Sequence, residues 1–216
     1  ARSLQVLFGK YLVPAGARLF LYNQDYAEIR GAYTDYNITE GLSFVTGDFP
    51  GNHVIIEYYE PADAKFAGDV VIGQVGRAYV DILMPKSGNT DNDGFIPVNC
   101  IEGKSVQDQK HAVCKYTFND GQYSYLCSGA LITTVDNSVR TYFLTAAHCI
   151  STPGEAATMV AYFNYEEAAC SAALVNPSQT LSGASLLSTG SESDYSLLKF
   201  DRSVPFTYKA DRKSVV

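Results

Sequence analysis

One histidine of the chain lies in surroundings suited to general-base catalysis. His148 follows the run Tyr142-Phe-Leu-Thr-Ala-Ala, which is apolar and then small, and it precedes Cys149. A general base must be held within about 0.5 Å of its working position, and small neighbours leave room for a nucleophile and a substrate. A bridge from Cys149 to Cys127 would clamp the strand that bears the histidine. These surroundings favour a catalytic role for His148.

The other two histidines lack such surroundings. His53 opens a hydrophobic, strand-like run, and His111 lies in a polar run. Histidines in these settings are mostly structural or solvent-exposed. We expect no chemistry from either.

Asp194 is a candidate for the carboxylate that orients His148. It ends a Ser/Gly-rich segment, 182–194, that we expect to be a loop, and it enters the apolar strand 195–200. A carboxylate at this place can be buried beside an imidazole and stabilise the imidazolium that forms when the base takes a proton. Without the histidine motif, a turn residue that starts a strand would be the better interpretation. The motif favours the catalytic role.

Composition and charge exclude several classes of protein. The chain has 216 residues, is 46% hydrophobic and 18% charged, and can bury a sizeable core. Sixteen Lys and Arg against twenty-three Asp and Glu give a net charge of −7, without a basic stripe, so we expect no nucleic-acid partner. Apolar runs of a few residues predict no membrane span. No cysteine spacing is typical of a zinc site, so we expect no metal and no cofactor.

The elements that must position His148 and Asp194 are predicted to be strands, because the sequence has the pattern of an all-β protein. Tyr, Phe, Val, Ile and Thr runs alternate with turn residues, and no amphipathic helix of ten or more residues is evident; the best attempt is 154–162. The predicted strands are 4–12, 18–22, 53–59, 69–72, 77–82, 112–118, 129–132, 142–145, 162–165 and 195–200.

Cysteine usage divides the chain in two. The first 99 residues contain no cysteine, and all five cysteines follow. Short strands at regular spacing predict a β-sandwich-like domain over 1–85. The polar stretch 85–93 predicts an exposed linker over 86–95, with a second β domain over 96–216. Disulfides in an oxidising compartment are favoured over free thiols, and the odd count leaves one cysteine without a partner in the chain.

The segments around Cys127 and His148 resemble those of a known family. Cys127-Ser-Gly-Ala-Leu-Ile and Leu144-Thr-Ala-Ala-His-Cys149 resemble the first barrel of the trypsin-like (chymotrypsin-fold) serine proteases. Further segments are similar to the bacterial lysyl endopeptidases within that family: 98–103, 108–113, 162–165 with Cys170, and 193–198. The resemblance spans about residues 87–205, and residues 1–85 resemble the propeptide region of such precursors.

The resemblance implies a role for each candidate residue. His148 would be the general base and Asp194 the carboxylate that orients it. Two disulfides would form, and Cys114 would be left over; the implied pairs are Cys100 with Cys170 and Cys127 with Cys149. The protein would be a secreted zymogen that acts on proteins or peptides, with cleavage after lysine. The bond between Lys86 and Ser87 would then be a self-processing site.

The nucleophile is the main departure from the family pattern. Family members carry a Gly-Asp-Ser-Gly-like or Gly-Ser-Ser-Gly-like motif after the aspartate, in a second barrel, and no such motif follows Asp194. The serines in 182–185 and 189–193 precede Asp194 and are in the wrong order. We therefore expect a fragment of a secreted serine endopeptidase precursor, inactive alone, that lacks its C-terminal barrel as an intramolecular partner.

Two other interpretations stay open. The chain could be a protease-like binding or adhesion module that has lost catalysis, although a natural binding module should close its core. A carbohydrate-binding β-sandwich depends on the aromatic content of residues 1–85 alone, and the absence of Trp counts against it.

Overall fold

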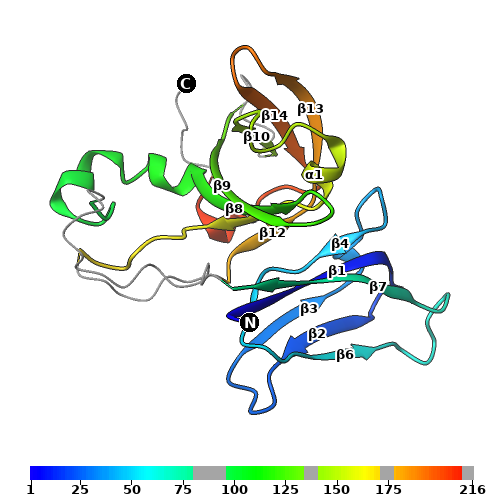
Figure 1. The fold of residues 1–216 in the computed structure, drawn as a ribbon. Coiled ribbons are helices and arrows are strands. Elements are labelled where there is room, and N and C mark those ends of the chain that lie inside the picture. Colours follow the sequence, from blue (N-terminus) through cyan, green and yellow to red (C-terminus); the bar gives the residue numbers. More distant parts are fainter. Residues whose placement is uncertain (80–95, 134–140, 171–177, 211–216) are drawn as a thin grey trace. The chain divides into compact units, whose positions relative to one another are not determined.

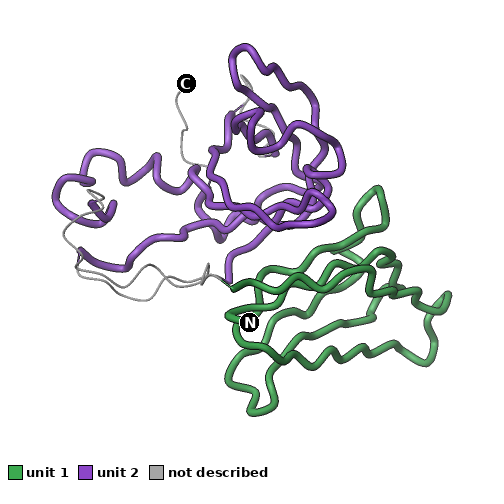
Figure 2. The backbone as a smooth tube through the Cα atoms, viewed as in Figure 1, with its two compact units in different colours: residues 1–81 green, residues 82–216 purple. Residues whose placement is uncertain are grey.

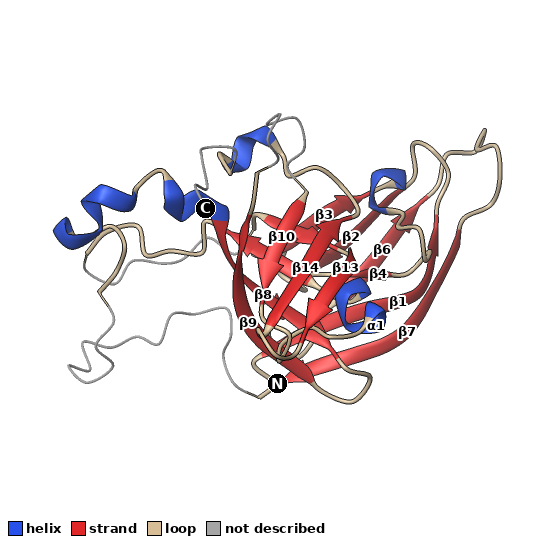
Figure 3. Cartoon of the chain, turned by 90° about the horizontal axis from the view of Figure 1, so that it is seen from above, coloured by secondary structure: helices blue, strands red, loops and turns tan. Residues whose placement is uncertain are grey.

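The computed structural model describes residues 1–79, 96–133, 141–170 and 178–210 (Figure 1). The chain divides into two compact units, residues 1–81 and residues 82–216 (Figure 2). Strands dominate both units, and the helices are short (Figure 3). The expected all-β fold is confirmed.

The first unit contains two antiparallel sheets. In one sheet, β1 is central and pairs with β7 along its length and with the short strands β4 and β5. In the other, β2 lies between β3 and β6. Phe8 and Phe44 from the first sheet and Leu19 and Leu21 from the second are buried in one cluster, so the unit is a small sandwich. The strands are β1 (Ser3–Leu12), β2 (Arg18–Tyr22), β3 (Ile29–Tyr33), β4 (Phe44–Val45), β5 (Phe49–Pro50), β6 (Ile55–Tyr59) and β7 (Asp69–Ala78).

The second unit is one curled, antiparallel sheet of seven strands in the order β12-β11-β8-β9-β10-β14-β13. The two edge strands, β12 and β13, are consecutive in the chain and separated by Gly183 alone. One residue spans at most about 3.5 Å, so the edges of the sheet must meet there and the sheet curls into a barrel. The strands are β8 (Val113–Asn119), β9 (Ser124–Leu131), β10 (Tyr142–Thr145), β11 (Val160–Phe163), β12 (Thr180–Ser182), β13 (Ala184–Gly190) and β14 (Tyr195–Phe200).

Aromatic side chains fill the barrel. Phe143 of β10 packs against Phe200 of β14 with ring centroids 5.4 Å apart, and Tyr116 of β8 meets Phe143 edge-on at 5.7 Å. All three are fully or almost fully buried. Burial of each ring contributes about 2 kcal/mol, so these contacts fix the neighbouring strands β10 and β14 relative to the rest of the sheet.

The structure corrects several of the predictions; the predicted strand 162–165, for example, ends at Phe163, because β11 spans Val160–Phe163. Residues 184–190 form strand β13, not a loop, because their backbone pairs with β14 over its whole length, although Ser185, Ser188 and Thr189 are exposed. The predicted strand 69–72 and the beginning of the predicted strand 77–82 belong to one strand, β7, which continues through Gly73 and ends at Ala78. Residues 80–82 of the second prediction lie outside the described residues. Gly73 lies against Gly9 of β1, where a side chain at position 73 would come within 3.1 Å of the Gly9 nitrogen.

Helical segments of the described residues are short, and the sequence patterns identified one of them in part. The α-helix α1 (Pro153–Ala157) is shorter than the 154–162 considered from sequence. It is fixed by a capping box in which Thr152 and Glu155 bond to each other's backbone amides. Four 3-10 segments complete the elements: η1 (Asp35–Asn37), η2 (Ile101–Val106), η3 (Gln109–Ala112) and η4 (Phe206–Tyr208).

Candidate active site

The ends of two neighbouring strands bring His148 and Asp194 together. β10 and β14 lie side by side (Figure 1), and Thr145 opposite Ser196 is their last residue pair. His148 lies three residues beyond this pair on one strand, and Asp194 lies two residues before it on the other. Because the strands are antiparallel, both positions fall at the same end of the ladder.

The Asp194 carboxylate contacts His148 twice. Its Oδ1 accepts a hydrogen bond from the backbone N–H of His148 at 2.9 Å, and its Oδ2 lies 2.6 Å from the ring Nδ1. One contact fixes the carboxylate on the backbone of the histidine, and the other fixes the orientation of the ring. Together they leave the imidazole little rotational freedom.

This geometry determines where the ring proton lies. Hydrogen bonds from the His148 backbone amide, from the His148 ring and from the Ala147 backbone, together with the charge interaction with His148, lower the pKa of Asp194, so its carboxylate is ionised at neutral pH. An ionised carboxylate is only an acceptor, so Nδ1 carries the proton and donates it to Oδ2. In a neutral imidazole that carries its proton on Nδ1, Nε2 is an acceptor. It makes no hydrogen bond within the described ranges.

The site is open to solvent. The His148 side chain is 71% exposed and the Asp194 side chain 49% exposed. The expectation that Asp194 is buried beside the imidazole is therefore wrong for this chain. Both residues lie beyond the last strand pair, where the sheet does not cover them.

The disulfides pair as the resemblance implied. Cys127 of β9 is joined to Cys149, the residue after His148, so the histidine segment is tied to a second strand. Cys100 is joined to Cys170. Cys114 is free and buried, and burial raises the pKa of its thiol well above the ordinary value.

Two inward-facing hydroxyl groups near the site were not identified from the sequence. Thr145 lies 2.7 Å from the Tyr116 hydroxyl and donates to the Ser128 carbonyl at 3.0 Å. Ser196 is fully buried on β14. The signal that could have found them is a hydroxyl residue at a position where strand alternation places an apolar side chain in the core.

The remaining candidate residues lie away from this site or outside the described residues. His111 contacts the Asn164 side chain at 2.6 Å, and His53 is exposed on the first unit. Lys86 and Ser87, the processing site implied by the resemblance, lie outside the described residues. Within the described ranges, no group of three or more His, Cys, Asp or Glu residues could hold a metal ion. No helix there has the length and apolar character needed to cross a membrane.

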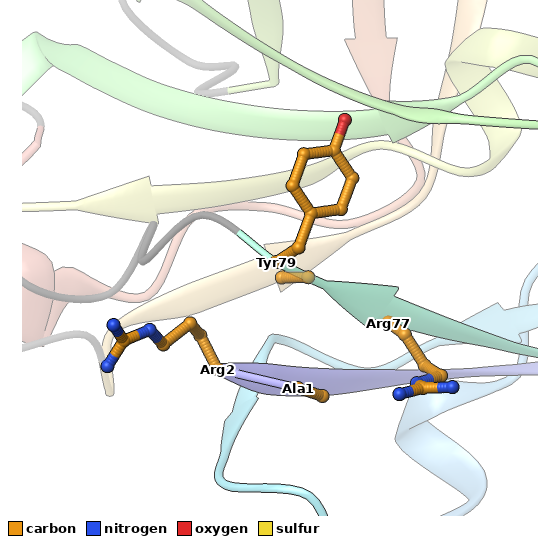
Figure 4. Close-up of a pocket in the computed structure, with 5 residues that line it drawn as sticks. Ala1, Arg2, Arg77 and Tyr79 are labelled. Atoms are coloured by element: carbon orange, nitrogen blue, oxygen red, sulfur yellow. The ribbon is translucent and has the colours of Figure 1, made fainter.

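The first unit has a pocket of about 510 Å³, but its lining residues do not form a second candidate site. It is lined by Ala1, Arg2, Arg77, Ala78 and Tyr79. The side chains of Arg2 and Arg77 point apart (Figure 4), so their guanidinium groups do not converge on one ligand.

Comparison with known proteins agrees with this geometry. Residues 86–210 match the family model described as the C-terminal domain of lysyl endopeptidase. The chain belongs to the lysyl endopeptidase family. The resemblance read from the His148 and Cys127 motifs is thereby confirmed.

A curated lysyl endopeptidase of Pseudomonas aeruginosa is similar to this chain. The two are 35% identical over 170 residues, which cover 72% of this chain and 36% of that protein. The chain therefore spans about a third of the length of this lysyl endopeptidase relative.

Proposed function

We propose that this chain carries the histidine and aspartate of a serine endopeptidase catalytic triad. His148 is the general base, and Asp194 holds its ring and stabilises the imidazolium. The observation that carries the proposal is the double contact of Asp194 with the backbone and the ring of His148. It presents Nε2 as a proton acceptor on an exposed face, which is the arrangement that a serine nucleophile requires.

The nucleophile is supplied from outside these 216 residues. A Gly-Asp-Ser-Gly-like motif is absent after Asp194. The oxyanion donors and the pocket that selects the substrate side chain also come from a second barrel, the intramolecular partner of residues 96–216. Membership of the lysyl endopeptidase family supports peptide-bond hydrolysis after lysine in protein substrates.

The domain arrangement is that of a secreted zymogen. Residues 1–85 form a propeptide-like domain, 86–95 a linker, and 96–216 the first barrel. The family match begins at residue 86, and both disulfides lie after it, which supports this division and an oxidising compartment. Processing occurs between Lys86 and Ser87.

A fluorophosphonate probe tests the proposal, because it reacts with serines activated by a neighbouring general base. We expect the complete gene product to be labelled and the 216-residue chain alone to remain unlabelled. Labelling of the complete product should be lost in His148→Ala and retained in His53→Ala, a matched change at an exposed histidine. A complete product that is folded and unlabelled would instead support an inactive, protease-like binding module.

A further inference from the structure

Ser196 places a hydroxyl group inside the barrel. Residues of β14 alternate between the two faces, and Ser196, Leu198 and Phe200 form the inward set. Ser196 is fully buried, as is Leu198. A polar group in such a position must find hydrogen-bond partners within the protein.

The partners of Ser196 lie on the histidine segment and on β13. Its Oγ donates to the backbone carbonyl of Ile150 at 2.5 Å. Its Oγ also lies 2.8 Å from the Thr189 hydroxyl. The single proton of the Ser196 hydroxyl is directed at the Ile150 carbonyl, and the Thr189 hydroxyl donates to the Tyr195 carbonyl at 3.2 Å.

These bonds close a small ring of residues around the candidate site. Ser196 lies two residues after Asp194, and Ile150 lies two residues after His148. The Ser196–Ile150 bond and the Asp194–His148 contacts therefore join the same two short segments, 148–150 and 194–196, at both ends. Cys149, between them, is held by its disulfide to Cys127.

We propose that Ser196 is a positioning residue that keeps Asp194 in register with His148. The inference rests on the proposed function, in which these two residues form part of a triad. Pairing of β14 with β10 ends at Ser196, and pairing of β14 with β13 ends at Tyr195, so neither ladder includes Asp194 or His148. The Ser196 hydroxyl extends the connection to Ile150, on the far side of His148.

The backbone conformation of Asp194 is one that neighbouring contacts must hold in place. Asp194 adopts a φ of +48°, in the left-handed region that residues other than glycine seldom occupy. Such a conformation persists where the surrounding contacts fix it. The Ser196 bond fixes the strand end directly after Asp194, and Thr189 holds the Ser196 hydroxyl from the neighbouring strand.

The test uses nuclear magnetic resonance on the 216-residue chain, which needs no nucleophile. The backbone amide of His148 donates to Asp194, so its chemical shift follows the titration of Asp194 and its hydrogen exchange reports how often the contact opens. The titratable group that acts on Asp194 in the described part of the chain is His148. Wild-type chain should give an Asp194 pKa below the ordinary value.

In Ser196→Ala, we expect the pKa of Asp194 to rise toward its ordinary value and the His148 amide to exchange roughly fivefold to tenfold faster, as for the loss of one hydrogen bond. Ser196→Thr, which keeps the hydroxyl, should restore both values. The matched control is Thr158→Val, which removes a hydroxyl bonded to the Asn119 and Glu155 carbonyls and not to segments 148–150 or 194–196, and it should leave both values unchanged.

A folded Ser196→Ala chain with the wild-type Asp194 pKa and exchange rate would overturn the proposal, even if its melting temperature fell. If Ser196→Ala does not fold, Thr189→Val decides, because Thr189 is exposed and its change removes the contact with Ser196 and the bond to the Tyr195 carbonyl but leaves the Ser196–Ile150 bond in place. We expect a smaller shift in the same direction from that variant, and no shift would refute the proposal. Absence of fluorophosphonate labelling in the complete product would refute the triad and leave these measurements unaffected.

Discussion

Thr145 and Ser196 face each other as the last pair of the β10–β14 ladder, and both turn their hydroxyl groups into the barrel. Each hydroxyl bonds to a backbone carbonyl outside this ladder, that of Ser128 and that of Ile150 respectively. His148 and Asp194 lie just beyond this pair. Hydrogen bonds from both strands therefore anchor the end of the ladder next to the candidate site.

Substitution of either candidate triad residue should abolish most activity of the complete gene product. We expect kcat to fall by about 10⁴-fold or more in His148→Ala and by about 10⁴-fold in Asp194→Asn, because the first removes the base and the second its orientation and tautomer. Hydrolysis of a lysyl ester or amide substrate is the measurement. His53→Ala serves as the control and should retain full activity. A complete enzyme indifferent to His148→Ala would contradict the triad assignment.

The depressed pKa of Asp194 predicts a pH-dependent contribution to stability. The pKa in the folded chain lies below its ordinary value, so the folded state binds fewer protons near pH 4 than the unfolded state does. The stabilisation is therefore complete above the unfolded pKa of about 3.9 and is lost as the pH falls through the lower, folded pKa. Wild type should exceed Asp194→Asn in free energy of unfolding at pH 7, and the difference should shrink by pH 3.

Urea unfolding at both pH values measures this difference. Glu192→Gln, in the same turn, removes the same charge and separates the specific contacts of Asp194 from a change in net charge. A gap between wild type and Asp194→Asn that is the same at both pH values would show that the carboxylate contacts do not contribute.

The two disulfides should contribute unequally to stability. They close loops with sequence separations of 22 and 70 residues. In the chain-entropy model the shorter loop contributes about 3 kcal/mol and the longer about 4 kcal/mol. Denaturant unfolding of Cys127→Ser/Cys149→Ser and of Cys100→Ser/Cys170→Ser should reproduce this order, and the reverse order would indicate that native-state contacts dominate.

Cys114 should resist alkylation in the folded chain. Its thiol is buried, and burial raises its pKa, so thiolate is scarce and shielded. We expect one reactive cysteine in denaturant and none in native buffer. Peptide mapping without reductant should return Cys100 with Cys170 and Cys127 with Cys149. Rapid native labelling of Cys114, or its recovery in a bridged peptide, would contradict this assignment.

The polar segment 85–93 should be the first site of cleavage. It has no apolar residue after Pro85, and such exposed, polar stretches are preferred by proteases. Brief digestion with an enzyme not restricted to basic residues should release a cysteine-free N-terminal fragment of about 85–93 residues. In the complete gene product, Lys86→Ala should block self-processing between Lys86 and Ser87. First cleavage within 1–79 would contradict a separate N-terminal domain.

The sequence by itself determined the class of elements and the identity of the candidate base. Runs of apolar and aromatic residues between turn residues predicted 18–22, 142–145 and 195–200 as strands with the bounds that the structure has. The motif around His148 indicated the family that the comparison confirmed. These features are local, because the apolar runs and the small residues before His148 each occupy consecutive positions in the sequence.

Only the tertiary structure decided how distant segments meet. Asp194 lies 46 residues from His148, and their contact depends on β14 being the neighbour of β10. Strand alternation fixes which side chains share a face but not which strands are adjacent. The closure of the sheet at Gly183, the conversion of 184–190 from an expected loop into a strand, and the Ser196–Ile150 bond follow from that long-range pairing. Asp194 is exposed because it lies beyond the last strand pair, and strand alternation predicts burial only for residues within a strand.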